Sequence, residues 1–152
     1  MSESNRRILK EMAEIEENPV PNITAFPSEK DLLRAWTAII RVDNEESVYH
    51  GGTFILEIQF PKDYPFKPPN VRFLTRVFHC NVSDRSGAIC IDLLKDQWSP
   101  VITIQKLLIS IAQLLDDPCP EDPLTPDVAE LFLKNRTQHD ETARLWTEKY
   151  AK

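Results

Sequence analysis

Residues 53–60 read Thr53-Phe54-Ile55-Leu56-Glu57-Ile58-Gln59-Phe60, and every second side chain is large and apolar. Successive side chains of a strand point to opposite faces, so this alternation predicts a strand with one face buried. The runs Trp36–Val42 and Val71–Arg76 are β-rich as well, and we expect an earlier strand at Ile23–Pro27. No helical pattern separates these runs. The sequence therefore predicts a four-stranded antiparallel meander.

An amphipathic helix is predicted before the sheet, from Ser4 to Glu17. Ile8, Met12 and Ile15 recur at helical spacing and form its buried stripe, which Leu9 would widen. Proline at position 19 ends the pattern. Three basic residues are expected to lie away from the apolar stripe: Arg6, Arg7 and Lys10.

Helical patterns also follow the sheet. Ile102–Asp116 is apolar round most of its circumference and should be a buried helix. Thr125-Pro126 predicts the start of a helix that runs to about Asn135. Thr137–Asp140 resembles a capping box for a last helix, whose buried side would carry Ala143, Trp146 and Tyr150. We therefore expect residues 1–152 to form a single domain of the α+β class.

Composition narrows the classes of function. The chain has 152 residues, 41% of them hydrophobic, and a net charge of −6, which argues against nucleic acid as a partner. The three cysteines show no disulfide-framework spacing and no run approaches a membrane span, so we expect reduced thiols in the cytoplasm or nucleus. The three glycines form no phosphate-binding loop, so we expect neither ATP nor another cofactor to bind.

The segment Phe60–Pro69 holds four prolines in ten residues and must be a stiff loop. An aromatic side chain on such a loop, Phe66, loses little entropy when it meets a partner. Alternatively, Tyr64 and Phe66 both pack down as a lid on the core. The residues alone leave both interpretations open.

A second irregular segment, Phe78–Pro100, carries Cys90 in a short apolar run, with Asn81 nine positions earlier. An isolated cysteine is more often a buried structural residue than a nucleophile. A hydrolase would need a histidine base at the thiol, and His79 is the only nearby candidate. The other two histidines, His50 and His139, are expected on the surface. A zinc site of His79, Cys80, Cys90 and Cys119 lacks the usual ligand spacing.

Several motifs together resemble the ubiquitin-conjugating enzymes, from about Arg6 to Ala151. They are Tyr64-Pro65-Phe66-Lys67-Pro68-Pro69, His79-Cys80-Asn81, Gly87-Ala88-Ile89-Cys90-Ile91-Asp92-Leu93-Leu94, Trp98-Ser99-Pro100 and Asp122-Pro123-Leu124. The family's usual triplet is His-Pro-Asn. The His-Cys-Asn of this chain resembles the E-type branch, within the D/E-type group. The resemblance implies the same fold: a helix, a four-stranded meander and then helices.

The resemblance also implies the activity. Cys90 would accept the C-terminus of ubiquitin from the activating enzyme as a thioester, and a ubiquitin ligase would promote its transfer to a substrate lysine. Asn81 would donate to the oxyanion or hold the loop that does so, and His79 would be a structural hydrogen-bonding residue. Asp122 would orient the incoming lysine and favour its neutral form, with help from Asp92.

The implied partners are ubiquitin, the activating enzyme, ligases of the RING or HECT type and substrate proteins, with no membrane contact and a monomeric enzyme. A weaker similarity places a second, non-covalent ubiquitin on the sheet at Thr24. The alternative function is conjugation of another ubiquitin-like modifier. The expected ligase and activating-enzyme contacts are Arg6, Arg7, Lys10, Phe66, Ser99, Pro100 and Val101.

Overall fold

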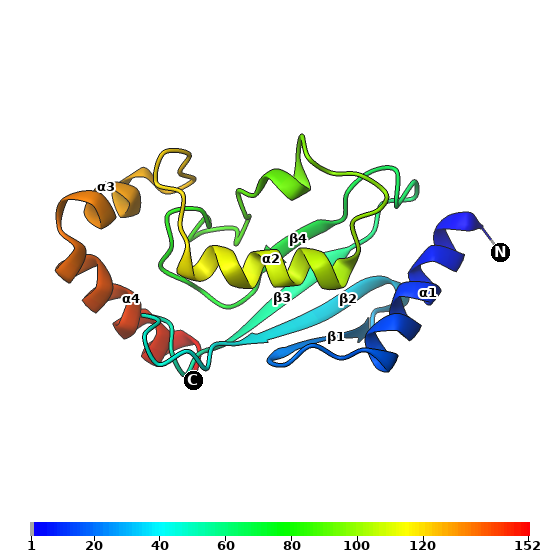
Figure 1. The fold of residues 1–152 in the computed structure, drawn as a ribbon, viewed down its shortest axis with the longest axis horizontal. Coiled ribbons are helices and arrows are strands. Elements are labelled where there is room, and N and C mark those ends of the chain that lie inside the picture. The colour runs from blue at the N-terminus through cyan, green and yellow to red at the C-terminus, as the bar shows by residue number, and fades with distance from the viewer. Residues whose placement is uncertain (1) are drawn as a thin grey trace.

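The structure, a computed structural model, describes residues 2–152. Its elements follow one another as α1 (Glu3–Glu17), β1 (Ile23–Ser28), β2 (Asp31–Arg41), β3 (Thr53–Gln59), β4 (Asn70–Phe73), the 3-10 helix η1 (Asp92–Leu94), α2 (Ile104–Asp116), α3 (Pro126–Lys134) and α4 (Arg136–Tyr150). Figure 1 shows this order along the chain. The predicted α+β class, with one helix before the sheet and helices after it, is confirmed. No helix within residues 2–152 has both the length and the apolar character needed to cross a membrane.

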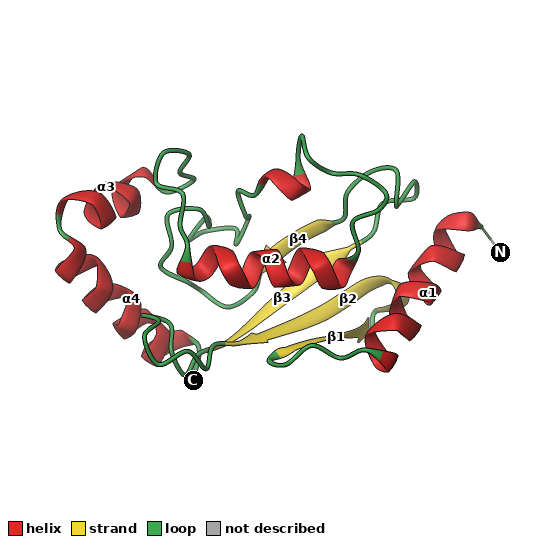
Figure 2. Cartoon of the chain, in the orientation of Figure 1, coloured by secondary structure: helices red, strands yellow, loops and turns green. Residues whose placement is uncertain are grey.

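The sheet is a meander in which the strands pair in chain order, β1-β2-β3-β4, all antiparallel. Figure 2 shows the strands in yellow behind the central helix. The predicted strand Trp36–Val42 is longer in the structure, because β2 already begins at Asp31. The predicted strand Val71–Arg76 is shorter, because β4 ends at Phe73. The chain then turns away, and Arg76 stacks on the rings of Trp146 and Tyr150 in α4.

One face of the sheet carries the core. Phe54, Leu56 and Ile58 of β3 are completely buried, as the alternation predicts. Leu107 and Ile111 of α2 belong to the same cluster, and α2 lies across this face of the sheet (Figure 2). The predicted start of this helix at Ile102 is two residues early. Thr103 is the N-cap, and its hydroxyl accepts the N–H of Lys106.

Helix α1 packs at the end of the molecule that carries the N-terminus (Figure 1). Ile8 is fully buried as predicted, but Leu9 is 40% exposed and does not widen the buried stripe. The position that does so is Glu11, which is 3% exposed although it carries a carboxylate. Its oxygens accept the backbone N–H of Ile104, the guanidinium N–H of Arg7 and the hydroxyl of Tyr64. Because these three donors satisfy its oxygens, the Glu11 carboxylate can be buried where α1 meets the core.

Of the two C-terminal helices, α3 begins where the sequence predicts, at Thr125-Pro126, whereas α4 does not. Asn135 caps α4 by accepting the N–H of Gln138, so the predicted capping box at Thr137–Asp140 is wrong and Thr137 lies within the helix. Thr125 stands at the N-cap position of α3, but its hydroxyl donates to the carbonyl of Val82 instead. That bond ties the start of α3 to the segment that carries Asn81.

The two aromatic residues of the proline-rich loop, Tyr64 and Phe66, differ in exposure. Tyr64 is 1% exposed and packs edge-on against Phe60, whereas Phe66 is 68% exposed. The indole N–H of Trp98 donates to the carbonyl of Pro65 at 3.0 Å and holds the loop between them. The structure therefore supports the lid interpretation for Tyr64. Phe66, in contrast, is exposed and free to contact a partner.

Candidate active site around Cys90

Cys90 ends an irregular segment that is anchored at the edge of the sheet. The backbone N–H of Cys90 donates to the carbonyl of Asn81 at 2.8 Å, and Phe73 of β4 donates to the carbonyl of Gly87 at 2.9 Å. Gly87 has a φ of +77°, and a Cβ there would lie 1.9 Å from the carbonyl oxygen of Phe73. Only glycine allows this close approach. The strand edge thus determines where the thiol lies.

A cleft of about 360 Å³ opens beside Cys90, although the residue itself is only 9% exposed. Three lining residues are carboxylates, and the lining holds no lysine or arginine. An acidic cleft beside a thiol suits a substrate that arrives as an amine. It brings together four predicted site residues, Asn81, Cys90, Asp92 and Asp122. The lining residues are Asn81, Cys90, Ile91, Asp92, Leu93, Gln97, Leu114, Cys119, Glu121 and Asp122.

Two charged groups lie next to the Cys90 sulfur. The thiol lies 3.5 Å from Oδ2 of Asp122, and the ammonium group of Lys95 lies 3.3 Å from Sγ. Asp92 begins η1 and its carbonyl accepts the N–H of Lys95, so the 3-10 turn directs the lysine back to the cysteine. The sequence analysis missed Lys95. Its position five residues after Cys90, just after a short apolar segment, was the available signal.

The environment of Lys95 bears on the role expected of Asp122. The hydrogen bond to the Cys90 thiol, with the carboxylates of Asp122 and Asp92, raises the pKa of Lys95. A carboxylate at this place thus favours the charged form of a neighbouring amine rather than the neutral form. Asp122 can still orient an amine or accept its proton.

Asn81 is buried, and its side chain makes bonds to the 119–122 loop. Its amide nitrogen donates to the carbonyls of Cys119 and Asp122, at 2.9 and 3.1 Å. Its amide oxygen accepts the N–H of Cys119 at 2.8 Å. Because an amide nitrogen has two hydrogens, both are used in this arrangement. The geometry favours the loop-holding role of the two that the resemblance implies.

His79 is buried and both its ring nitrogens are occupied. The N–H of Asn81 donates to Nδ1, so Nε2 carries the hydrogen and donates to the carbonyl of Leu114 at 2.7 Å. Burial lowers the pKa of His79 to about 4. A neutral ring with no free nitrogen is a structural residue, and the arrangement makes His79 unsuitable as a base for Cys90.

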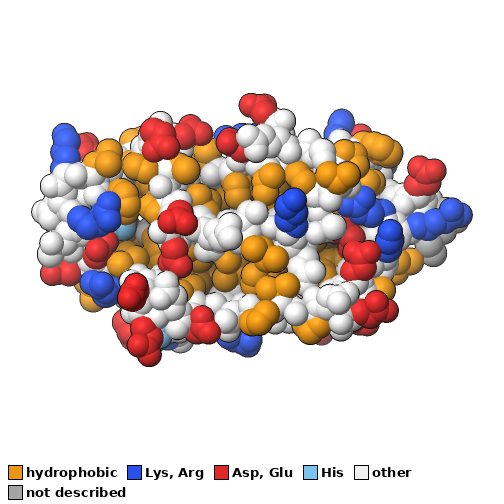
Figure 3. Space-filling view, viewed as in Figure 1, with side chains coloured by type: hydrophobic (Ala, Val, Ile, Leu, Met, Phe, Trp, Pro, Cys, Tyr) orange, Lys and Arg blue, Asp and Glu red, His pale blue; other side chains and the backbone are white. Residues whose placement is uncertain are grey.

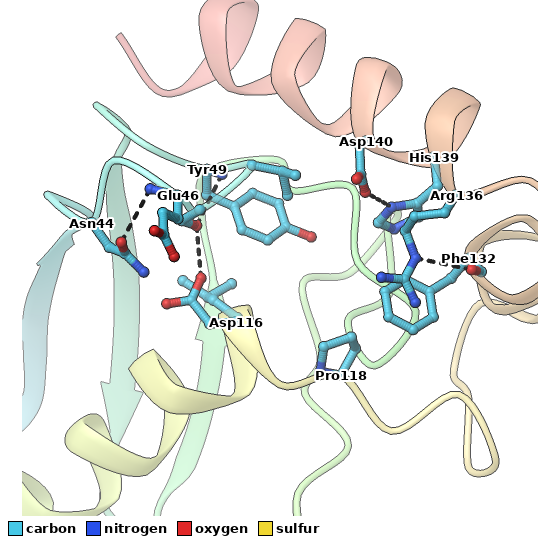
Figure 4. A pocket seen from close by; sticks show the side chains of 12 residues that line it. Asn44, Glu46, Tyr49, Asp116, Pro118, Phe132, Arg136, His139 and Asp140 are labelled. Carbon is cyan, nitrogen blue, oxygen red and sulfur yellow. Dashed lines mark hydrogen bonds and ion pairs between the residues drawn. The ribbon is translucent and has the colours of Figure 1, made fainter.

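The prediction that His139 lies on the surface is wrong. Figure 4 shows a separate pocket between the 44–49 loop, the end of α2 and the helices α3 and α4, where His139 points inward. The ring is 4% exposed, packs on Phe78 and Phe132, and lies 2.9 Å from the carboxylate of Asp140. The contact with Phe78 comes from a distant part of the sequence, which the local pattern around His139 cannot indicate. His50 is exposed, as predicted.

The other two cysteines differ from Cys90. Cys80 is 1% exposed in a small apolar cluster with Val128 and Ala129, and burial raises its pKa to about 11. Cys119 is exposed and lines the same cleft as Cys90. All three thiols are free, and residues 2–152 contain no group of three or more side chains arranged to hold a metal ion.

The expected ligase contacts gather around α1 and the segment after η1. Arg7, Lys10, Pro100 and Val101 line one hollow, and the side chain of Val101 is 82% exposed. Figure 3 shows basic side chains on the surface at the α1 end. Ser99 is half-buried, and its hydroxyl accepts the N–H of Val101. Phe66 does not line this hollow, but its loop is tied to Trp98 beside it.

Arg7 is less free than the sequence analysis expects. Its side chain is 22% exposed, pairs with Glu11 at 3.0 Å and donates to the carbonyl of Ile102, also at 3.0 Å. Arg6, by contrast, is exposed. The expectation that all three basic residues lie away from the buried face thus needs correction for Arg7, because the buried Glu11 draws its guanidinium inward.

Comparisons with known proteins identify the family. The family model for ubiquitin-conjugating enzymes matches residues 7–147. The E2 domain of a Toxoplasma gondii ubiquitin-conjugating enzyme is 40% identical, with 97% of this chain and 98% of that chain covered and a TM-score of 0.88. A crystal structure of a Plasmodium yoelii protein assigned as a ubiquitin-conjugating enzyme is 39% identical, with 99% and 97% covered and a TM-score of 0.91. The chain belongs to the ubiquitin-conjugating enzyme family and is a transferase of the ubiquitin conjugation pathway.

Proposed function

We propose that Cys90 is the residue that carries ubiquitin, as a thioester with its C-terminus, between the activating enzyme and a substrate lysine. Family membership implies ubiquitin, an activating enzyme and ligases as partners in general. The observation that carries the proposal for Cys90 is its position. It is the one thiol of the described chain that both borders the acidic cleft and lies within 3.5 Å of a carboxylate, Asp122.

Within residues 2–152 no histidine base lies at Cys90, and this fits the chemistry. A thioester is already an activated acyl group, so an amine can attack it without the histidine that a hydrolase needs. The ring of His79 is fully occupied by Asn81 and Leu114. Transfer then depends on positioning the amine and on stabilising the negative charge that forms on the carbonyl oxygen.

Asp122 is proposed to orient the incoming lysine, since its carboxylate lies beside the sulfur and faces the cleft. It would act by accepting a hydrogen bond or the departing proton. Asp92 lines the same cleft and would add to its negative potential. Asn81 is proposed to hold the 119–122 loop through its three amide bonds, and thereby to keep Asp122 in place.

Ligases of the RING or HECT type, and the activating enzyme, are proposed to bind the surface formed by α1, the Phe66 loop and residues 99–101. Phe66 and Val101 are exposed apolar side chains, 68% and 82% exposed, on segments held by backbone bonds. Arg6 and Lys10 supply an exposed basic rim. Interfaces commonly combine apolar anchors with a charged rim that directs orientation.

Finer assignments are proposals too. The triplet His79-Cys80-Asn81 supports the E-type branch, and a single-domain monomer without nucleic-acid partners accords with the acidic chain. Thr24 is exposed on β1, as a second, non-covalent ubiquitin site would require.

The test is a charging assay with the activating enzyme, Mg-ATP and each modifier in turn. We expect a reductant-sensitive adduct with ubiquitin, on Cys90 alone. Charging by another ubiquitin-like modifier and not by ubiquitin would support the alternative function. Loading that persists in Cys90→Ala would overturn the assignment of the nucleophile.

A further inference from the structure

The proposed ligase surface is assembled from three segments that lie far apart in sequence. They are α1, the loop that presents Phe66, and residues 99–101 ahead of α2. Separate segments form one binding surface only when their relative positions are fixed. All three segments converge on one side chain, that of Glu11, which lies on the buried side of α1 and is 3% exposed.

The two carboxylate oxygens of Glu11 have different partners. Oε1 accepts the backbone N–H of Ile104 at 2.6 Å, and Ile104 is the first residue of α2. That bond fixes where residues 99–103 enter the helix. Oε2 accepts the Nε–H of Arg7 at 3.0 Å and the hydroxyl of Tyr64 in the proline-rich loop. One carboxylate thus bonds to α1, to the start of α2 and to the proline-rich loop.

Further contacts join the same three segments. Nη2 of Arg7 donates to the carbonyl of Ile102 at 3.0 Å, and the guanidinium carbon lies 5.7 Å from the centre of the Tyr64 ring. The Tyr64 and Trp98 rings lie 5.9 Å apart, and the Trp98 indole donates to the carbonyl of Pro65. Hydrogen bonds to a charged carboxylate are among the strong ones, so we expect the three bonds to Glu11 to determine how these segments are arranged.

We propose that Glu11 is a positioning residue of the ligase surface: its buried carboxylate holds α1, the Phe66 loop and residues 99–101 in the arrangement that a ligase recognises. This rests on the ligase surface proposed above. Glu11 acts through the donors that it holds, because a side chain only 3% exposed offers little surface to a partner. It is not among the residues that line the Cys90 cleft within the described chain. Loss of its charge should therefore weaken ligase binding and leave the chemistry at Cys90 unchanged.

Glu11→Gln removes the charge and keeps the shape of the side chain. A carboxamide has one accepting oxygen, and its NH₂ group only donates. If that oxygen takes the place of Oε1, the guanidinium of Arg7 faces the NH₂ group. If it takes the place of Oε2, the backbone N–H of Ile104 faces the NH₂ group instead. In either orientation at least one of the three attachments is lost.

Single-turnover discharge of the ubiquitin thioester to free lysine tests this, measured against the concentration of an isolated RING domain that accelerates the parent enzyme. For Glu11→Gln we expect the half-maximal RING concentration to rise at least about tenfold. The rates at saturating RING domain and without it should stay within about twofold of the parent. Tyr64→Phe removes one of the three donors and should raise the half-maximal concentration about threefold. The two substitutions combined should raise it by less than the product of the separate effects, because they break the same bond.

Ile8→Val is the matched control, since Ile8 is fully buried on the same helix. It lowers the stability without removing any of these hydrogen bonds, so the half-maximal RING concentration should not change. If Glu11→Gln does not fold, the threefold rise for Tyr64→Phe decides alone.

Two results overturn this inference alone. One is an unchanged half-maximal concentration in Glu11→Gln and Tyr64→Phe. The other is a rise in Ile8→Val as large as that in Glu11→Gln at an equal loss of stability in urea, which would mean that Glu11 only supports the fold. If Phe66→Ala responds to the RING domain as the parent does, the proposed ligase surface is wrong and this inference is wrong as well.

Discussion

The side chain of Asn81 and the backbone of Cys119 form a reciprocal pair: Nδ2 of Asn81 donates to the Cys119 carbonyl at 2.9 Å, and Oδ1 accepts its N–H at 2.8 Å. The two residues are 38 positions apart in the chain. A third bond from the same amide reaches the carbonyl of Asp122. Asn81 thus links the segment that carries Cys90 to the 119–122 loop, which carries the Asp122 carboxylate.

Loss of this pair should slow the discharge of ubiquitin to lysine more than the charging of Cys90. Asn81→Ala leaves polar groups of the 119–122 loop without partners, at about 1–3 kcal/mol for each group that stays buried. Asp122 then loses its fixed place, so discharge to lysine should slow far more than charging at Cys90. Rates of both steps under single-turnover conditions check this, and amide hydrogen exchange should rise at Cys119–Asp122. Slower discharge with unchanged exchange would instead favour an oxyanion role, for which losses of about 2.7–4 kcal/mol are known.

The nucleophile can be identified by the chemistry of its adducts. Cys90→Ala should not load ubiquitin, and Cys90→Ser should form an oxyester that resists reductant but is cleaved by mild alkali. Cys119→Ala is the matched control, because Cys119 lines the same cleft yet is exposed at its rim. If Cys90→Ala loads normally and Cys119→Ala does not load, the nucleophile is Cys119 and not Cys90.

Substitution of Phe66 should impair ligase-dependent transfer of ubiquitin but not the intrinsic reactivity of the Cys90 thioester. Its ring is 68% exposed, so its truncation removes little core packing, while interface anchors are commonly worth about 2 kcal/mol or more. Phe66→Ala should abolish ligase-stimulated transfer and leave discharge of the thioester to free lysine nearly intact. Leu145→Ala, also 68% exposed but on α4, is the control and should change neither rate. Equal slowing of both reactions by Phe66→Ala would mean that the ring supports the fold.

Substitution of Arg7 should reduce the stability of the protein more than substitution of Arg6. Arg7 pairs with the buried Glu11 and holds the Ile102 carbonyl, so Arg7→Ala should lower the free energy of unfolding by about 1–3 kcal/mol. Arg6 is exposed, and Arg6→Ala should stay within about 0.5 kcal/mol of the parent protein. Urea denaturation compares them. Equal stability of the two variants would mean that the Arg7–Glu11 pair contributes nothing to the fold.

Acid should destabilise the protein through His79. Burial lowers its pKa from 6.5 to about 4, so the unfolded chain binds a proton that the folded chain does not. The contribution is therefore complete above about pH 6.5 and is lost as the pH falls toward 4, at a total of about 3 kcal/mol. The imidazole resonances of His79 should stay those of the neutral ring at pH 5. His79→Gln should show a smaller loss of stability between pH 6.5 and 5 than the parent protein.

Local patterns were sufficient for the strands, the α-helices and their order, but not for the 3-10 helix η1. The alternation in residues 53–60 determined β3, because a strand exposes and buries its side chains in turn. The prolines of the 60–69 segment determined a loop, since proline lacks the donor that a central strand or helix needs. The motifs around Cys90 indicated the family and named Asn81 and Asp122 before any geometry was known.

Only the tertiary structure decided how these groups work. Asp122 reaches Cys90 across 32 positions of chain, and Lys95 returns to it through the turn of η1, distances that no periodic pattern encodes. Burial of His139 and the inward turn of Arg7 also depend on partners distant in sequence: Phe78 for the ring and the Ile102 carbonyl for the guanidinium. The physical reason is common to these cases. Sequence periodicity reports which face of an element is apolar, whereas hydrogen bonds and charges across a site depend on the loops that the packed core brings together.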